Sequence, residues 1–277
     1  MTDTVYAFDE LRAEQQPAAG GSGGTRARLY QAGYPVPEGF VILPSGFGAD
    51  VPSGDVPSGD ELPAGAWAEV QAHLARLRGD DPQAAFAVRS SALAEDSARA
   101  SFAGEFETVL DTRTDEAVRS AIHTVRQSRH SERVRAYCQA RGLDPDQEMA
   151  VVVQRLVPAE VSGVLFTADP VSGSRGQMVG NYVHGLGDRL VSGEAQPHEF
   201  TLSRPKGSYE GPPELKRLAR RLYKLAVRLE RDLGSPQDIE WAVANATGSR
   251  GKLYILQSRP ITTLLGFDPV SGEFNDS

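Results

Sequence analysis

This 277-residue sequence has a single cysteine, Cys138, and no long uninterrupted hydrophobic run. One cysteine excludes an intrachain disulfide and fits a reducing compartment. Because no run of about 18 apolar residues occurs, we expect no membrane-spanning helix. The first residues are acidic and lack the basic and apolar segments of a signal peptide. We therefore expect a cytoplasmic protein that does not bind membranes.

Basic residues are fewer than acidic ones: the sequence has 29 Lys and Arg and 37 Asp and Glu, which gives a net charge of −8. This balance gives no support for nucleic-acid binding, which depends on Lys and Arg contacts to phosphate. The hydrophobic content of 40% and the charged content of 24% are ordinary for a globular protein. The length suits one large domain or two lobes around a cleft.

The stretch DIEWAVANATGSRGKLYILQSRP, residues 238–260, has two alternating apolar runs around a break rich in Gly, Ser and Asn. This pattern predicts a β-hairpin. Asp238 and Glu240 share a face of the first strand, and Gln257 and Arg259 share a face of the second. Carboxylate and amide oxygens suit Mg²⁺, and a guanidinium suits phosphate. The hairpin indicates nucleoside triphosphate chemistry, with a solvated face of incidental charges as the alternative.

A glycine-rich stretch, PAAGGSGG at residues 17–24, precedes a short helix expected at residues 25–32. Glycine-rich segments that open a helix hold phosphate through backbone N–H groups. Glycines also mark plain flexible loops, so both interpretations stay open. No lysine occurs here, which excludes a Walker A loop.

Arg89 ends the strand candidate FAVRS, where a buried charge without a partner is costly. Its expected partner is either a phosphate or one of the carboxylates of Glu95 and Asp96. The remaining pattern predicts an α+β protein. Helices are expected at residues 63–78, 115–141 and 214–233, a central strand at 150–157, its neighbouring strand at 161–170, and further strands at 177–185 and 198–203.

Five segments, in order, resemble the nucleotide-binding module of the phosphoenolpyruvate synthase, pyruvate phosphate dikinase and rifampin phosphotransferase family. They are AGYPVPEGFVI, AVRSSALAEDSARASFAGEFET, MAVVVQRLVPAEVSGVLFTADPVSG, GLGDRLVSG and PQDIEWAV with KLYILQSRPIT. The resemblance implies an α+β ATP-grasp fold, in which two lobes with a mostly antiparallel sheet surround an ATP cleft. We place the lobes at residues 1–149 and 150–265, and a linker to absent domains at 266–277.

The resemblance also implies roles for individual residues. Arg89 and Arg259 correspond to phosphate-binding arginines. Glu240 and Gln257 correspond to the Mg²⁺ ligands, with Asp238 beside them in the nucleotide site. We expect Arg89, Arg259 and Glu240 to take part in catalysis.

Further contacts to ATP are implied at two other places. Gly104 and Thr108 belong to SFAGEFET, which corresponds to the loop that closes over the phosphates. Gln154, Leu156 and Val157 correspond to the strand whose backbone meets the adenine edge. The chemistry implied is transfer of the β-phosphoryl group of ATP to a histidine, with release of AMP and phosphate.

Two departures from the family pattern stand out. The lysine of the family's GGK motif is Ser22 here, after Gly20 and Gly21, whose backbone N–H groups remain suited to phosphate. Loss of one charged contact at such a site lowers the rate by about 10²–10³. None of the five histidines has the sequence context of the family's phosphate carrier. The expected partners are therefore a histidine-bearing swivelling domain and a substrate-binding domain, on the full-length protein or on another chain.

Three functions remain open from the sequence. The first is the ATP- and Mg²⁺-binding module of a dikinase-type phosphotransferase. The second is a regulatory nucleotide-binding module that has lost catalysis, for which Ser22 is the supporting feature. The third is an ATP-grasp ligase that forms ADP through an acyl phosphate. The nucleotide product, AMP or ADP, separates the third from the first.

Overall fold

The computed structural model describes residues 4–48, 61–92, 107–141, 148–187, 196–244 and 251–261. The chain forms two compact units, Met1–Leu156 and Val157–Ser277. Each unit contains one β-sheet, and every strand pairing in the described ranges is antiparallel. The expected α+β class with mostly antiparallel sheets is confirmed.

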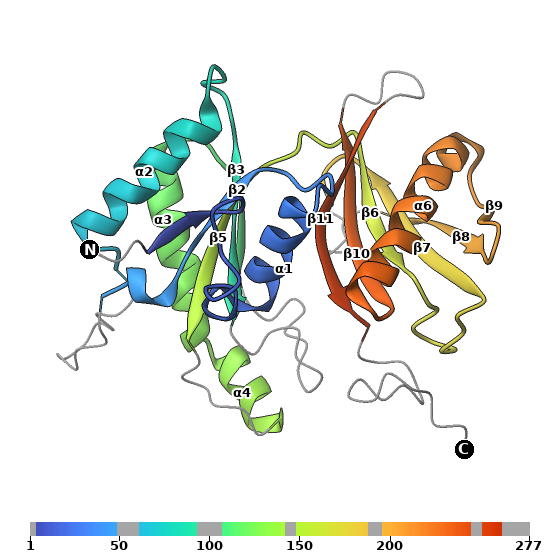
Figure 1. Ribbon diagram of the computed structural model, residues 1–277, viewed down its shortest axis with the longest axis horizontal. Helices are drawn as coiled ribbons and strands as arrows, with labels where there is room; N and C mark the ends of the chain where they lie inside the picture. Colours follow the sequence, from blue (N-terminus) through green and yellow to red (C-terminus); the bar gives the residue numbers. More distant parts are fainter. Residues whose placement is uncertain are drawn as a thin grey trace. The chain divides into compact units, whose positions relative to one another are not determined.

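Unit 1 has a five-stranded sheet in the order β1-β2-β5-β3-β4. Helices α2 and α3 cover one face of this sheet, and α1 lies on the other (Figure 1). The bounds are β1 Val5–Ala7, α1 Gly20–Gln31, β2 Gly39–Ile42, α2 Ala64–Arg78, β3 Phe86–Ala92, β4 Thr108–Thr112, α3 Asp115–Gln127, α4 Glu132–Arg141 and β5 Met149–Arg155, with short 3₁₀ turns at Pro17–Ala19, Pro44–Gly46 and Ser128–His130.

The predicted central strand is β5, which pairs with β2 on one side and β3 on the other. Val151 and Val153 are fully buried in the core formed with α2 and α3. Because side chains alternate along a strand, Val152 and Gln154 face the side occupied by α1. By the same alternation, Arg89 and Ser91 of β3 also lie on the face that α1 covers.

Helix α1 begins at Gly20 rather than at Thr25, so most of the expected glycine-rich loop is helical. Glycine is a poor helix former, but tertiary contacts override that preference here. A side chain at Gly23 would lie 3.3 Å from Val152, which shows how closely α1 approaches the sheet. The glycines at residues 20–24 therefore allow α1 to pack closely on the sheet, and most of them do not form the loop that the sequence pattern suggested.

The helix expected at residues 115–141 is divided into α3 and α4 by the 3₁₀ turn at Ser128–His130. The hydroxyl of Ser128 donates to the Val125 carbonyl oxygen at 2.7 Å. Such local side-chain bonds compete with regular helix bonds and favour a break. Cys138 on α4 is buried.

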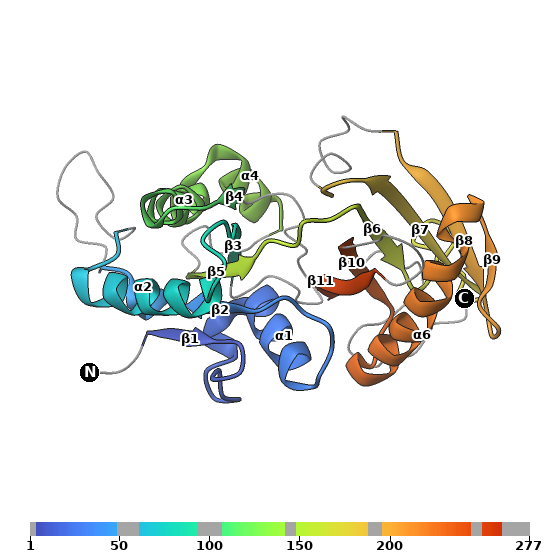
Figure 2. The ribbon, with the colours of Figure 1, turned by 90° about the horizontal axis from the view of Figure 1, so that it is seen from above.

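Unit 2 has a six-stranded sheet in the order β11-β10-β6-β7-β8-β9. Helix α6, which matches the helix expected at residues 214–233, packs on one of its faces (Figure 2) and buries Leu222 and Leu229. The bounds are β6 Val161–Phe166, β7 Gln177–His184, β8 His198–Ser203, β9 Ser208–Glu210, a 3₁₀ turn at Pro213–Leu215, α6 Lys216–Leu233, β10 Gln237–Ala244 and β11 Lys252–Pro260. The strands expected at 177–185 and 198–203 are confirmed as β7 and β8.

Strand β6 is not the neighbour of β5, contrary to the expectation from the sequence. The chain passes from unit 1 to unit 2 between Leu156 and Val157, so β6 pairs with β10 and β7 instead. The sequence placed the lobe boundary between residues 149 and 150. The boundary in the structure lies at residues 156–157, because β5 pairs with β2 and β3 and so belongs to unit 1.

Some expectations concern residues outside the described ranges, namely Glu95, Asp96, Gly104 and the linker at 266–277. Of the helices in the described part of the chain, none has the length and hydropathy that a membrane-spanning helix requires.

Candidate functional site

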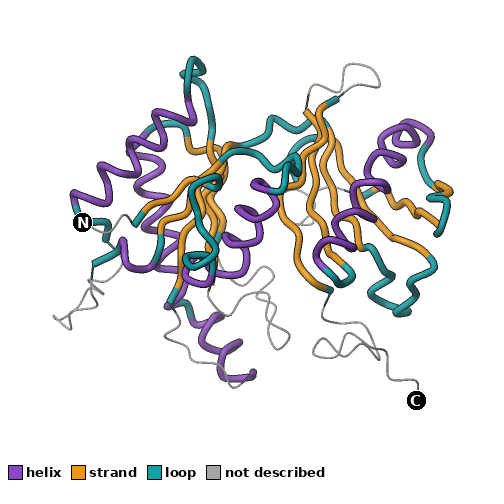
Figure 3. Tube along the Cα trace, viewed as in Figure 1, coloured by secondary structure: helices purple, strands orange, loops and turns teal. Residues whose placement is uncertain are grey.

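Strands β10 and β11 form the predicted hairpin, drawn as adjacent strands in Figure 3. Asp238 lies directly opposite Arg259, and Glu240 lies directly opposite Gln257. A register shift follows Glu240, so the four polar residues occupy the regular part of the ladder. The structure therefore brings together the four hairpin residues selected from the sequence.

These side chains lie on the face of the sheet opposite α6. The intervening residues Ile239 and Trp241 are fully buried, whereas Asp238 and Glu240 retain some exposure. Strand β6 supplies the next residues on that face, Val164 opposite Glu240 and Phe166 opposite Asp238.

Asp238 and Arg259 form an ion pair within the sheet. The Arg259 Nε donates to Asp238 Oδ2 at 2.8 Å, and the side chains are 18% and 13% exposed for Arg259 and Asp238. Burial raises the pKa of the Asp238 carboxyl above its usual range, against the opposing effect of Arg259. Asp238 thus orients the second candidate phosphate-binding arginine, a role that the sequence did not distinguish from nucleotide contact.

Glu240 and Gln257 have the chemistry of a Mg²⁺ site. Both provide side-chain oxygens from directly opposite positions, and Gln257 is 7% exposed. Mg²⁺ is usually bound through one or two carboxylates while keeping several waters. Among the described residues, no group of three or more His, Cys, Asp or Glu forms a larger metal site. The pair fits Mg²⁺ with a coordination shell completed by water or phosphate.

An apolar cluster continues along the same face of β10. Ala242 and Ala244 are buried with Val157, and Tyr254 and Leu256 pack against them. The partly exposed Tyr254 and Leu256 leave apolar surface beside the candidate metal and phosphate ligands, the layout that a nucleotide base and its phosphates require. Of the three residues expected near adenine, Val157 is the one that belongs to this cluster.

The other two residues expected near adenine lie in unit 1. The Gln154 Nε2 donates to the Pro37 carbonyl oxygen at 3.2 Å, and the side chain is 2% exposed. The Leu156 backbone N–H donates to the Ala85 carbonyl oxygen at 2.8 Å. These bonds fix the strand end that leads into Val157.

Arg89 lies on the α1 face of the unit 1 sheet and is partly buried. Its register partners are Val152 on β5 and Thr108 on β4. Residues paired directly across antiparallel strands share a face, so Thr108 stands beside Arg89. Thr108 is exposed, which suits its expected contact with the phosphates from the segment that closes over them.

Ser91 joins the first turn of α1 to the same face, two residues after Arg89. Its hydroxyl donates to the Ala19 carbonyl oxygen at 2.7 Å and accepts from the Gly23 N–H at 2.8 Å. Through this contact Gly20, Gly21 and Ser22 are fixed to the strand that carries Arg89. Sequence reasoning missed Ser91, although its even spacing from Arg89 places both on one strand face.

Ser22 does not face open solvent, as it is 3% exposed. Its hydroxyl accepts a hydrogen bond from the guanidinium of Arg26, one helical turn later. Arg26 is itself 2% exposed and was also missed by sequence reasoning. The sequence did contain a signal for this contact, because Arg26 follows Ser22 by four residues and therefore lies on the same face of a helix.

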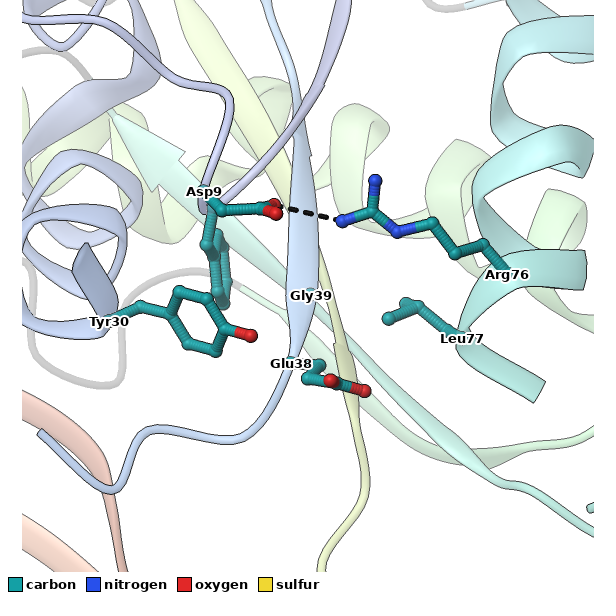
Figure 4. A pocket seen from close by; sticks show the side chains of 7 residues that line it. Asp9, Tyr30, Glu38, Gly39, Arg76 and Leu77 are labelled. Atoms are coloured by element: carbon teal, nitrogen blue, oxygen red, sulfur yellow. Dashed lines mark hydrogen bonds and ion pairs between the residues drawn. The ribbon is translucent and has the colours of Figure 1, made fainter. Parts of the chain in front are cut away.

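A separate surface pocket lies between α1, β2 and α2 (Figure 4). Across it, Arg76 forms ion pairs with Asp9 at 2.9 Å and with Glu10 at 2.7 Å. None of its lining residues is among those selected from the sequence; they are Phe8, Asp9, Tyr30, Glu38, Gly39, Arg76 and Leu77.

Residues 58–211 and 214–266, about three quarters of the chain, match the family described as "Pyruvate phosphate dikinase, AMP/ATP-binding domain". The probable phosphoenolpyruvate synthase of Methanocaldococcus jannaschii is 30% identical over 320 residues, which cover 93% of this chain and 26% of that protein. The rifampicin phosphotransferase of Streptomyces sviceus is 39% identical over 209 residues, covering 65% of this chain and 24% of that protein. Among solved structures, D-alanyl-alanine synthetase A from Vibrio cholerae matches 89% of this chain and 56% of that one, with a TM-score of 0.40 and 11% identity.

The chain spans between about a quarter and a half of the length of the curated relatives it matches. Those relatives have further sequence beyond the region shared with this chain. The match to the family extends over both units and includes Arg89 and the complete β10–β11 hairpin. This chain therefore belongs to the pyruvate phosphate dikinase family of AMP/ATP-binding domains.

Proposed function

We propose that this chain is the ATP- and Mg²⁺-binding module of a dikinase-type phosphotransferase. In this function ATP phosphorylates a histidine on a separate domain, with release of AMP and phosphate. The single observation that carries the proposal is the hairpin register, which sets Asp238 opposite Arg259 and Glu240 opposite Gln257.

Each unit, taken by itself, contains groups suited to binding a nucleotide. In unit 2, Arg259 binds phosphate, and Glu240 and Gln257 hold Mg²⁺, which would neutralise charge on the phosphate oxygens. In unit 1, Arg89 binds phosphate beside Thr108. Phosphoryl transfer depends mainly on positioning and on stabilising charge on the phosphoryl group, so these groups are of the appropriate kind.

Positioning by the chain's own residues is a further part of the proposal. The Asp238 carboxylate accepts a hydrogen bond from the Nε of Arg259 and so fixes the orientation of the guanidinium. Tyr254 and Leu256, which pack against Val157 and are partly exposed, provide apolar surface for the base. The histidine-bearing domain and a substrate-binding domain are the proposed partners, and the substrate that receives the phosphoryl group binds there.

Calorimetric titration of ATP, ADP and AMP into the purified chain, with Mg²⁺ or with a chelator, tests the binding part. We expect Mg²⁺-dependent ATP binding that Glu240→Gln weakens at least tenfold, because one ionic ligand is removed. The matched control is Glu199→Gln, an exposed glutamate on the same sheet that leaves ATP affinity unchanged. Equal ATP affinity in the Glu240→Gln variant and the parent would contradict the placement of the metal.

The nucleotide product tests the reaction. The chain is incubated with labelled ATP, Mg²⁺ and a supplied histidine-bearing domain, and the products are separated. AMP and phosphohistidine support the proposal. Formation of ADP supports the ligase alternative instead. Tight ATP binding without any phosphohistidine, even in the Ser22→Lys variant, supports the regulatory alternative.

A further inference from the structure

A change of strand register lies directly beside the candidate metal ligands. Glu240 of β10 is opposite Gln257 of β11. The next residue of β10, Trp241, is opposite Ile255, so β11 contains one extra residue at this point. A bulge of this kind leaves a residue unpaired and interrupts the ladder of backbone hydrogen bonds. The pairing on the far side of the bulge therefore does not determine which residue of β11 faces Glu240.

The position of the bulge decides whether the candidate site forms. If the two strands paired without it, Leu256 would lie opposite Glu240. A shift of one residue exchanges the two faces of a strand. Gln257 and Arg259 would then both turn toward α6, away from the face that carries the carboxylates of β10. The metal and phosphate ligands thus depend on one register out of two that differ by a single residue.

A buried hydrogen bond on the opposite face of the hairpin is specific to the observed register. Ser258, between Gln257 and Arg259, is 2% exposed, and its hydroxyl donates to Gln237 Oε1 at 2.8 Å. Gln237, which precedes Asp238, is 1% exposed. Alternation along the strands places both side chains on the α6 face. In the shifted register Ser258 would turn to the other face, and the buried Gln237 oxygen would lose this donor.

Gln237 is itself held by neighbouring segments. Its Nε2 donates to the carbonyl oxygen of Ser235 at 3.0 Å and to the Ser235 hydroxyl at 2.9 Å. Its backbone N–H donates to the Thr167 hydroxyl at 2.8 Å, and its carbonyl oxygen accepts from the Thr167 N–H at 2.8 Å. Thr167 directly follows β6 and is fully buried. Ser258 therefore bonds to a side chain whose place is fixed by two other parts of unit 2.

We infer that Ser258 and Gln237 are positioning residues for the candidate Mg²⁺ and phosphate ligands. Their hydrogen bond selects the register in which Gln257 faces Glu240, and so places Arg259 on the same face. Neither Ser258 nor Gln237 lies on that face, so both act through the residues beside them. Single buried polar side chains select the register of other packed structures in the same way. This inference rests on the proposed ATP-binding function.

The test is calorimetric titration of Mg²⁺-ATP into the whole chain and its Ser258→Val and Ser258→Thr variants. Valine and threonine have nearly the same shape, but only threonine keeps a hydroxyl. We expect the Kd for Mg²⁺-ATP to rise about ten- to a hundredfold in Ser258→Val, the range for loss of groups that orient metal ligands. Ser258→Thr should bind Mg²⁺-ATP like the parent.

Tyr182→Phe is the matched control for loss of a buried hydrogen bond in the same sheet. Tyr182 is fully buried, and its hydroxyl donates to Glu214 at 2.9 Å. The control variant should leave the Kd for Mg²⁺-ATP unchanged, because its hydrogen bond does not set the register of β10 and β11.

A double variant, Ser258→Ala with Gln237→Met, separates positioning from stability. Removal of both partners leaves neither group buried alone, so the double variant should be more stable to urea than Ser258→Ala. Its affinity for Mg²⁺-ATP should nevertheless stay low. Recovery of the affinity together with the stability would overturn the inference. If circular dichroism shows that Ser258→Val is unfolded, the double variant decides.

A folded Ser258→Val variant that binds Mg²⁺-ATP like the parent, while Glu240→Gln binds it weakly, also overturns the inference. That result leaves the proposed function intact. Absence of Mg²⁺-ATP binding in the parent would overturn both.

Discussion

The Nε of Arg259 donates to Oδ2 of Asp238 at 2.8 Å, across two residues that face each other on β11 and β10. Both side chains are mostly buried, at 18% and 13% exposed. One edge of the guanidinium is therefore held by the sheet itself. Desolvation raises the pKa of the Asp238 carboxyl, and the adjacent Arg259 guanidinium opposes this shift by favouring the charged carboxylate.

Removal of this carboxylate should destabilise unit 2. We expect Asp238→Ala to lower the free energy of unfolding by about 3 kcal/mol, because it leaves a buried guanidinium without its partner carboxylate. Urea unfolding followed by the fluorescence of Trp241, on the same strand, measures the change. Asp232→Ala, which removes surface ion pairs with Arg228 and Arg231, should change it by less than about 0.5 kcal/mol.

A double variant separates this effect from general damage to the sheet. Asp238→Ala with Arg259→Met should be more stable than Asp238→Ala alone, because the buried charge is gone. If the double variant is the less stable of the two, the destabilisation does not arise from the isolated guanidinium.

Substitution of Ser91 should loosen α1 from the sheet. Ser91→Ala removes both the bond to the Ala19 carbonyl and the bond from the Gly23 N–H, and Ser91 is fully buried. Buried polar groups left without partners cost about 1–3 kcal/mol each, so we expect a loss in that range or above it. Ser90→Ala, at the adjacent buried position on the other strand face, is the control. Equal losses in the two variants would argue against the role of Ser91.

Gly20 should tolerate no side chain. Its φ is +74°, and a Cβ atom there would lie 2.4 Å from the Ser91 carbonyl oxygen. Gly33 has a φ of +75° with nothing within 4 Å, so Gly33→Ala measures the backbone strain alone. We expect about 1–2 kcal/mol for Gly33→Ala and a clearly larger loss for Gly20→Ala, read from the fluorescence of Trp67 in unit 1. Similar losses would mean that α1 shifts easily away from β3.

Unit 1 should lose stability in mild acid through His73. This imidazole stacks on Phe40 with ring centroids 5.2 Å apart. Burial lowers its pKa below 6.5, with Arg76 adding to the shift and Glu10 opposing it. The unfolded chain then binds a proton that the folded chain does not, so stability falls as the pH drops below 6.5 toward the folded pKa.

Urea unfolding between pH 7.5 and pH 5, reported by Trp67, measures this dependence. His73→Gln should make the slope shallower by up to about 1.4 kcal/mol per pH unit, the value for one proton. His184→Gln, an exposed histidine of unit 2, should leave the slope seen by Trp67 unchanged. An unaltered slope in His73→Gln would contradict the assignment.

The sequence alone determined the features that depend on local periodicity. The alternation around Glu240 and Gln257 predicted the hairpin and its polar face, because side chains alternate with a period of two residues. The helix expected at residues 214–233 corresponds to α6, and the central strand expected at 150–157 corresponds to β5. The pairing of Asp238 with Arg259 followed once the hairpin register was fixed.

Only the tertiary structure decided the features that depend on contacts between distant residues. Ser91 fixes the start of α1 through a bond to Gly23, 68 residues away, which no local pattern reports. The division of β5 and β6 between two sheets depends on which strands are available to pair, not on their composition. The hydrogen bond from Arg26 to Ser22 was likewise not predicted from the sequence. A helical pattern predicts which residues share a face of the helix, but not what covers that face.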